Sequence, residues 1–169
     1  MSGIVSDTGS NSRVVRQQET VDHWMLTSNQ AGNATPLSGF TRHSSYQANM
    51  GPAMTEASGV FTFPFVGLWQ IDWTQNYSHS ASSRYIEGVI QDNSSGSFQT
   101  KRYMYGNFNV ASSTWYVTAY ATYIFRCNTL AHQIRFTQSA ESSVTTKSGL
   151  AESWVSFRNL NPQGYNVSM

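Results

Sequence analysis

The sequence predicts an all-β chain whose antiparallel strands form two sheets. Apolar and polar residues alternate in several short segments, clusters of Gly, Pro, Asn and Ser separate these segments, and helical periodicity is almost absent. Aromatic residues make up 14% of the 169 residues although the apolar fraction is 39%, so large rings must supply much of the core. Such a composition favours sheets over helices.

The chain divides into an arm and one domain. Residues 1–20 are rich in Gly, Ser, Asn and Thr and show almost no apolar periodicity, so we expect an extended N-terminal arm. Residues 21–169 contain no internal repeat and predict a single domain, which at this size buries about 70% of the surface that the unfolded chain exposes.

The first strand is predicted at residues 21–27, and a long polar connection rich in Gly and Pro follows it. Further strands are predicted, in chain order, at residues 59–64, 67–74, 84–90, 97–108, 114–127, 132–137 and 154–160. Residues 92–96 read Asp-Asn-Ser-Ser-Gly, a composition typical of turns, and therefore predict a hairpin between two of these strands.

The alternation within each strand predicts which side chains form the core. In residues 67–74, Trp69, Ile71 and Trp73 fall on one face of the strand, while polar residues take the other face. The same reasoning assigns the remaining core positions to Phe61, Phe63, Trp115, Phe125, Cys127, Phe136, Val155 and Phe157.

The strand at residues 114–127 is apolar on both faces. Its second face carries Tyr116, Tyr120 and Ile124. A strand that is solvated on one side would show polar residues there. The pattern therefore predicts a second contact surface, such as a subunit interface.

Charge limits the possible partners. Charged residues make up 11% of the chain, against about 25% in typical domains, and the net charge is +1, so neither nucleic acid nor a membrane is an expected partner. No segment reaches the roughly 20 apolar residues of a membrane span.

The segment 101–105, Lys-Arg-Tyr-Met-Tyr, is interpreted as a solvated strand edge. Cys127 is the only cysteine and is expected to be buried.

No catalytic, cofactor-binding or metal-binding residues are predicted. The four histidines, His23, His43, His79 and His132, lie in different segments without metal-ligand spacing. Residues 78–80 are expected to form a polar loop with no acid beside His79, which argues against a catalytic triad. Asp72 and Glu87 are expected in opposite sheets, which disfavours a glycosidase pair. The chain is therefore expected not to be an enzyme and to need no cofactor.

Residues 59–71, Gly-Val-Phe-Thr-Phe-Pro-Phe-Val-Gly-Leu-Trp-Gln-Ile, resemble a block found in the jelly rolls of tumour necrosis factor and of complement globular heads. The resemblance covers roughly residues 21 to 162. It implies an antiparallel two-sheet jelly-roll sandwich and a homotrimer that aromatic side chains pack about a threefold axis. Another antiparallel sandwich is the alternative fold.

The resemblance also implies an interface. Alignment on Gly67 places Leu68, Gln70 and Asp72 near the axis, and alignment on Cys127 adds Tyr116, Tyr120 and Ile124, with Trp154 beside them. The family usually has apolar groups where Gln70 and Asp72 stand. Because buried unpaired carboxylates are costly, we expect either Arg126 to pair with Asp72 or the axis to hold water near that level.

The chain also resembles small structural proteins of marine phages, in its Gly/Ser-rich arm and its strand Trp-Met-Leu-Thr at residues 24–27. This likeness implies a virion protein, namely a trimeric capsid decoration or knob protein that binds the major capsid protein or another virion protein, partly through its arm. The alternative is a tail-associated trimer that binds a host surface glycan through loop tyrosines, with Tyr46, Tyr77 and Tyr165 as candidates.

Overall fold

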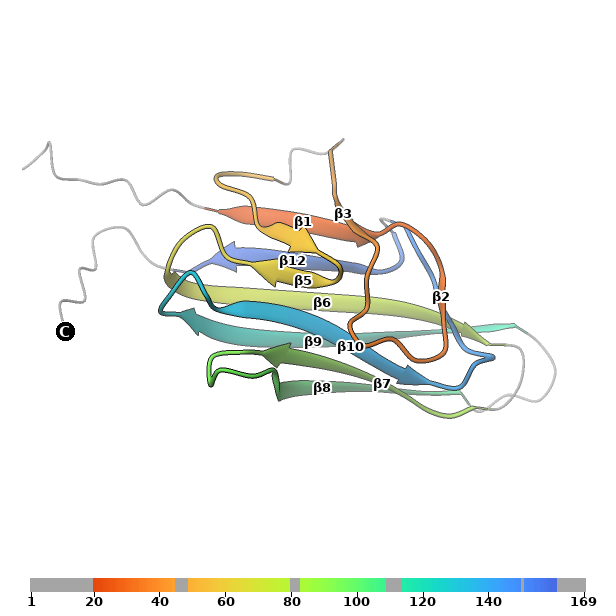
Figure 1. Cartoon of the computed structure of the whole chain (residues 1–169). Helices are drawn as coiled ribbons and strands as arrows, with labels where there is room; N and C mark the ends of the chain where they lie inside the picture. Colours follow the sequence, from red (N-terminus) through yellow and green to blue (C-terminus); the bar gives the residue numbers. More distant parts are fainter. Residues whose placement is uncertain (1–19, 45–48, 80–82, 109–113, 150, 161–169) are drawn as a thin grey trace, which may run out of the picture.

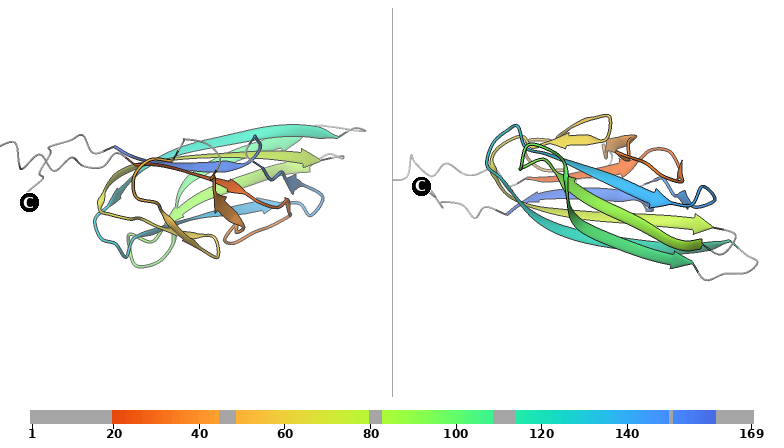
Figure 2. Two further views of the ribbon diagram at one scale, coloured as in Figure 1. Left: turned by 90° about the horizontal axis from the view of Figure 1, so that it is seen from above. Right: turned by 60° about the horizontal axis from the view of Figure 1, so that its bottom comes forward.

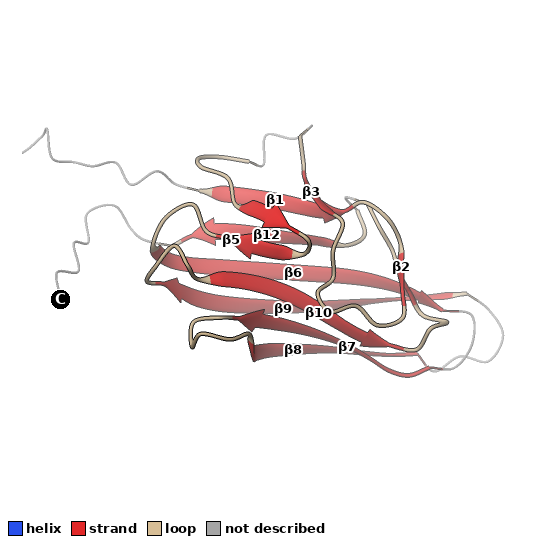
Figure 3. Ribbon diagram, viewed as in Figure 1, coloured by secondary structure: helices blue, strands red, loops and turns tan. Residues whose placement is uncertain are grey.

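The computed structural model describes residues 20–44, 49–79, 83–108, 114–149 and 151–160 (Figure 1). Every regular element within these residues is a strand (Figure 3), and none is a helix long and apolar enough to cross a membrane. The predicted all-β class is confirmed. The predicted arm, apart from Thr20, lies outside the described residues.

Two antiparallel sheets form the fold. In spatial order, the first sheet contains β3 (Phe40–Arg42), β1 (Val21–Leu26), β12 (Trp154–Asn159), β6 (Gly67–His79) and β9 (Trp115–Cys127), with β11 (Thr145–Thr146) and β2 (Gln30–Ala31) beside the end of β6. The second contains β4 (Thr55–Ala57), β5 (Val60–Thr62), β10 (Gln133–Ala140), β7 (Ser83–Asp92) and β8 (Gln99–Phe108). The sheets stack as two layers (Figure 2), which confirms the predicted sandwich.

Sequence reasoning missed four very short strands. β2 and β3 lie within the predicted long connection, β4 precedes the predicted strand at residues 59–64, and β11 follows β10. None is longer than three residues. A segment of this length shows no readable alternation, so the strand that it pairs with defines it.

Aromatic rings fill the space between the sheets. Phe61 is fully buried, and its ring contacts four others, Trp24, Phe40, Phe136 and Phe157, at centroid distances of 5.1 to 5.7 Å. The other predicted core residues that the structure buries are Phe63, Trp69, Ile71, Trp73, Phe125, Cys127, Phe136, Val155 and Phe157.

Trp115 is a correction, because its side chain is 51% exposed although it was predicted to be in the core. It is the first residue of β9 and pairs with His79. Val117, two residues further along, still packs near Gly106 of β8. Ala119 and Ala121, further along the same face of β9, are buried, so burial increases from the end of the strand inward and the indole lies at the exposed end.

Asp92 joins the two sheets at one end of the core. Its carboxylate lies in β7 and accepts hydrogen bonds from the Tyr123 hydroxyl of β9 at 2.8 Å and from the backbone N–H of Ser94 at 3.0 Å. Burial by itself raises the pKa of Asp92, but the hydrogen bonds from Ser94 and Tyr123 and the charge of Lys101 outweigh it, so the pKa lies below its ordinary value. This carboxylate therefore stabilises the fold while it is ionised.

We expect Tyr123→Phe to lower the free energy of unfolding by about 1.5–3 kcal/mol at neutral pH, because a hydrogen bond to a charged buried group is lost. A carboxylate with a lowered native pKa stabilises the fold above its ordinary pKa of 3.8, and this contribution is lost as the pH falls below that value. The cost of the substitution should therefore shrink in acid. Urea unfolding of both proteins across this pH range measures it, with Tyr103→Phe as the exposed control. A cost that is the same at every pH would contradict the conclusion that the Tyr123 hydroxyl stabilises the ionised form of Asp92.

Candidate functional site

The outer face of the first sheet carries an unusual number of exposed apolar side chains. Side chains of β9 alternate between the core and this face. The outward ones include Tyr116, Tyr120 and Ile124, which are 59%, 56% and 48% exposed. Soluble monomers seldom leave several large apolar groups together on one strand. This face is therefore the candidate functional site.

Strand register brings the other predicted interface residues to the same face. Asp72 of β6 lies opposite Thr122 of β9, and Gln70 lies opposite Ile124. Leu68 is two residues further along β6, and Trp154 of β12 lies opposite Thr74. Leu68, Gln70, Asp72 and Trp154 are all partly buried within a single chain. The predicted interface residues are therefore neighbours on one surface.

Asp72 is held by neutral donors. Its carboxylate accepts hydrogen bonds from the Gln70 side-chain amide at 2.7 Å and from the hydroxyls of Tyr120 and Thr122, both at 2.8 Å. The hydrogen bond with Thr122 by itself lowers the pKa of Tyr120. The contact of Tyr120 with Asp72 and its partial burial outweigh this effect, so the pKa of Tyr120 lies above its ordinary value and its hydroxyl remains a proton donor.

Within a single chain, Arg126 does not pair with Asp72, so an ion pair between them would have to join two subunits. Arg126 pairs with Leu68, whereas Asp72 pairs with Thr122. These rungs are four residues apart on β9, or about 13 Å along an antiparallel strand. The side-chain amide and hydroxyls beside Asp72 are nearer and supply its hydrogen bonds instead.

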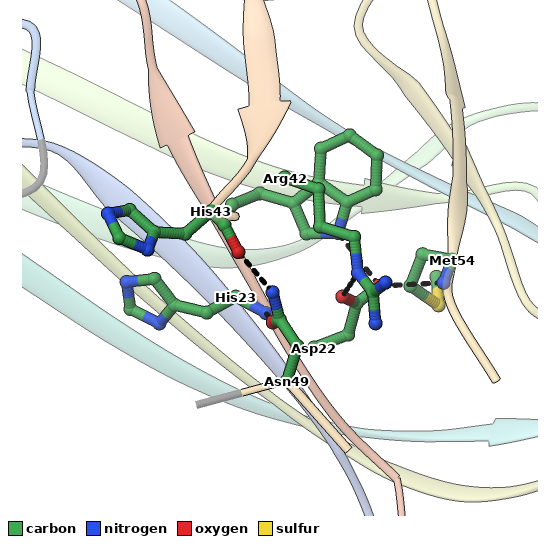
Figure 4. A network of polar contacts seen from close by, with 7 residues as sticks. Asp22, His23, Arg42, His43, Asn49 and Met54 are labelled. Atoms are coloured by element: carbon green, nitrogen blue, oxygen red, sulfur yellow. Dashed lines mark hydrogen bonds and ion pairs between the residues drawn. The ribbon is translucent and has the colours of Figure 1, made fainter. Parts of the chain in front are cut away.

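Beyond β12 the same face continues onto β1 and β3. The ring of His23 on β1 lies 4.9 Å from the ring of Trp154. His43 follows β3 and donates its backbone N–H to the carbonyl of His23 at 3.0 Å. Figure 4 shows the two imidazoles projecting side by side. Sequence reasoning missed this pair because the histidines belong to different strands.

The structure also corrects the predicted position of His79. It is the last residue of β6 and is buried, although residues 78–80 were expected to form a polar loop. Its Nε2 lies 3.1 Å from the hydroxyl of Ser143. Within the described residues, no three His, Cys, Asp or Glu side chains gather as metal ligands would. Asp72 and Glu87 lie in opposite sheets, as predicted.

Tyr77 is also misplaced by the sequence prediction. It was expected in an exposed loop, but it is a fully buried residue of β6 whose hydroxyl donates to Gln75. The side-chain amide of Gln75 in turn contacts Gln138 at 3.1 Å, within a buried polar cluster. Tyr77 therefore cannot contact a glycan. Tyr46 and Tyr165 lie outside the described residues.

The second sheet has an aromatic pair of its own. Tyr103 and Tyr105 of β8 are exposed, with nearly parallel rings 5.6 Å apart and an angle of 7° between their planes. The sequence contains the signal for this pair, since residues two apart share one face of a strand. It was interpreted as a solvated edge.

The chain was compared with protein families, curated proteins and solved structures. No family model matches it, and no curated protein matches it. Among solved structures, murine APRIL at pH 5.0 aligns with a TM-score of 0.65 and 10% identity, covering 84% of this chain and 99% of that one. Eiger TNF from S. frugiperda aligns with a TM-score of 0.65 and 10% identity, covering 90% of this chain and 99% of that one.

The fold is tumour necrosis factor-like. This confirms the family of folds that the block at residues 59–71 implied. At sequence identities near 10%, the likeness shows the fold alone. Within this tumour necrosis factor-like fold, the candidate surface is the outer face of the sheet that contains β9, β6, β12 and β1.

Proposed function

We propose that three copies of this chain associate through the outer face of the first sheet, and that the homotrimer is a non-enzymatic structural protein of a phage particle. The observation that carries this proposal is the row of exposed Tyr116, Tyr120 and Ile124 on one strand. Burial of such side chains against sister copies removes apolar surface from water, which is the main driving force of association. The tumour necrosis factor-like fold supports this arrangement.

The surface suits burial for a second reason. Tyrosine is enriched at interfaces because its ring is apolar while its hydroxyl can find a partner. Asp72 is the acidic group near the middle of the surface, and three hydrogen bonds already satisfy its carboxylate. A carboxylate that enters an interface with its donors costs less than an unpaired one.

The placement on a phage particle rests on composition and resemblance. Only 11% of the residues are charged, so the surface depends on Ser, Thr, Asn and Gln. The polar segment at residues 1–20 would supply part of the contact with the major capsid protein or another virion protein. The proposed role is therefore capsid decoration, at the surface of the virion.

Sedimentation of matched variants tests the self-association. Ile124→Glu places a charge on the proposed interface, whereas Tyr105→Glu places the same charge at a 64% exposed site on the other sheet. We expect the wild type and Tyr105→Glu to sediment as trimers, and Ile124→Glu to associate at least about 100-fold more weakly because its charge would have to be desolvated. Circular dichroism should show all three proteins equally folded.

A wild-type protein that sediments as a folded monomer at high micromolar concentration would remove the proposed trimer. The virion role has its own test, which is to quantify this chain against the major capsid protein in purified particles. Decoration requires many copies per particle. A few copies, or none, would contradict it.

The stacked Tyr103 and Tyr105 favour a second candidate function, a tail-associated trimer that binds a host surface glycan. The pair lies on β8 in the second sheet, whereas the proposed interface is the outer face of the first sheet. Flat aromatic faces can stack on the apolar face of a pyranose ring. A glycan array probed with the wild type and with Tyr103→Ala/Tyr105→Ala tests this function, and an array without hits would exclude it.

A further inference from the structure

The backbone holds His23 and His43 together. The register of β1 and β3 pairs Trp24 with Arg42, so the preceding rung sets His23 opposite His43. The carbonyl of His23 accepts a hydrogen bond from the N–H of His43 at 3.0 Å. The side-chain amide of Asn49 completes the rung, because it accepts from the N–H of His23 at 2.8 Å and donates to the carbonyl of His43 (Figure 4).

We propose that His23 and His43 together bind one divalent transition-metal ion, of the type Zn²⁺, Ni²⁺ or Cu²⁺, through their imidazole nitrogens. Directly opposed residues of an antiparallel pair have Cβ atoms about 4.5–5.5 Å apart. Two imidazoles that project in parallel from this spacing can both reach an ion, since zinc–nitrogen bonds are about 2.0–2.1 Å long. Imidazole is a ligand that suits zinc, copper and nickel.

The surroundings of His23 favour its neutral imidazole. Burial lowers the pKa of His23, and the neighbouring His43 lowers it further, while Asp22 acts in the opposite direction. A neutral imidazole is the form that binds a metal. His23 is therefore available as a ligand at neutral pH.

The charged groups around His23 and His43 are compatible with a bound cation. Arg42 of β3 forms an ion pair with Asp22, which is buried on the core side of β1. Arg158 of β12 pairs with Val21, one position along the face from the rung of His23. Asp72 lies two strands away from His23 through Ser156, or about 10 Å at ordinary strand spacing, and adds a favourable negative charge without being a ligand.

The protein would supply two ligands. In the described parts of the chain no third His, Cys, Asp or Glu joins the pair. An ion held by two strands stabilises the folded state, because the unfolded chain does not keep the two imidazoles together. Metal binding should therefore stabilise the edge formed by β1 and β3.

Calorimetric titration of the untagged protein with ZnCl₂ or NiCl₂ at neutral pH tests this site. We expect one ion per chain in the wild type and in the control His132→Ala, and at least about tenfold weaker binding in His23→Ala and in His43→Ala. At a metal concentration roughly 100 times Kd, the melting temperature of the wild type should rise by about 5 °C, and the rise should disappear in either variant. Acidification below the ordinary histidine pKa should abolish binding, since protons compete for the same nitrogens.

Two further measurements keep the result unambiguous. His43 is buried, so His43→Ala could lose stability for other reasons, and each variant is therefore compared with its own metal-free form. Cu²⁺ provides a direct readout, because its electron paramagnetic resonance spectrum should show two nitrogen ligands and because the ion should quench Trp154, whose ring lies 4.9 Å from that of His23. Equal binding by wild type and His23→Ala would overturn the proposal. A monomer that binds one ion would support it while contradicting the proposed trimer.

Discussion

Asp22→Ala should lower the free energy of unfolding by about 3–5 kcal/mol, because the substitution leaves buried donors without an acceptor. Asp22 is fully buried, and one of its carboxylate oxygens accepts from the indole N–H of Trp24 at 2.9 Å and from the backbone N–H of Met54 at 2.7 Å. Its other oxygen pairs with Arg42. The carboxylate therefore joins β1, β3 and the segment that leads into β4 (Figure 4).

Urea unfolding of the purified variant measures this cost, and Glu141→Ala is the matched control because it removes an exposed carboxylate. The control should stay within about 0.5 kcal/mol of the wild type. The side chain of Arg42 is 36% exposed and can regain water, so most of the loss should come from Trp24 and Met54. If Asp22→Ala and Glu141→Ala cost the same, Asp22 is not the buried acceptor that the structure describes.

Gly59→Ala is the other large effect, with an expected cost of about 3 kcal/mol or more from strain and overlap together. Ser58 and Gly59 form the two-residue turn between β4 and β5, with φ angles of 52° and 84°. A Cβ atom on Gly59 would lie 2.4 Å from the backbone carbonyl oxygen of Leu37. Because that oxygen belongs to the backbone, it cannot move aside as a flexible side chain could.

Gly96→Ala separates the two contributions. Gly96 also has a positive φ, 91°, but no atom lies within 4 Å of the position where its Cβ would be. Its substitution should therefore cost only the backbone strain, about 1 kcal/mol. Calorimetric melting of both variants gives the difference, which measures the packing of Leu37 against the turn. Equal melting temperatures would show that this contact is absent.

Much of the fold could be predicted because its signals are local. Trp69, Ile71 and Trp73 alternate with polar residues along β6, and a strand presents every second side chain to the same face whatever lies around it. The same rule predicted that Tyr120 and Ile124 face away from the core. The candidate surface was thus visible in the sequence as a strand that is apolar on both sides.

The errors arose where burial depends on the partner. Trp115 continues the core face of β9, but it is the first residue of that strand and its indole stays exposed. Tyr77 and His79 were predicted in loops, yet β6 runs on to His79 and buries both. The alternation of residues within a strand does not predict where the strand ends or which of its terminal residues the rest of the fold covers.

By itself the sequence determined the strand class, the inward and outward faces of each long strand, and the turn chemistry, because these depend on residues within a few positions of one another. Only the tertiary structure decided which side chains meet across strands. The contacts of Asp72 with Tyr120 and Thr122, and of His23 with His43, join residues far apart in the chain, and strand register creates them. Register follows from the packing of the whole sandwich, since a shift of one residue would turn every side chain to the opposite face.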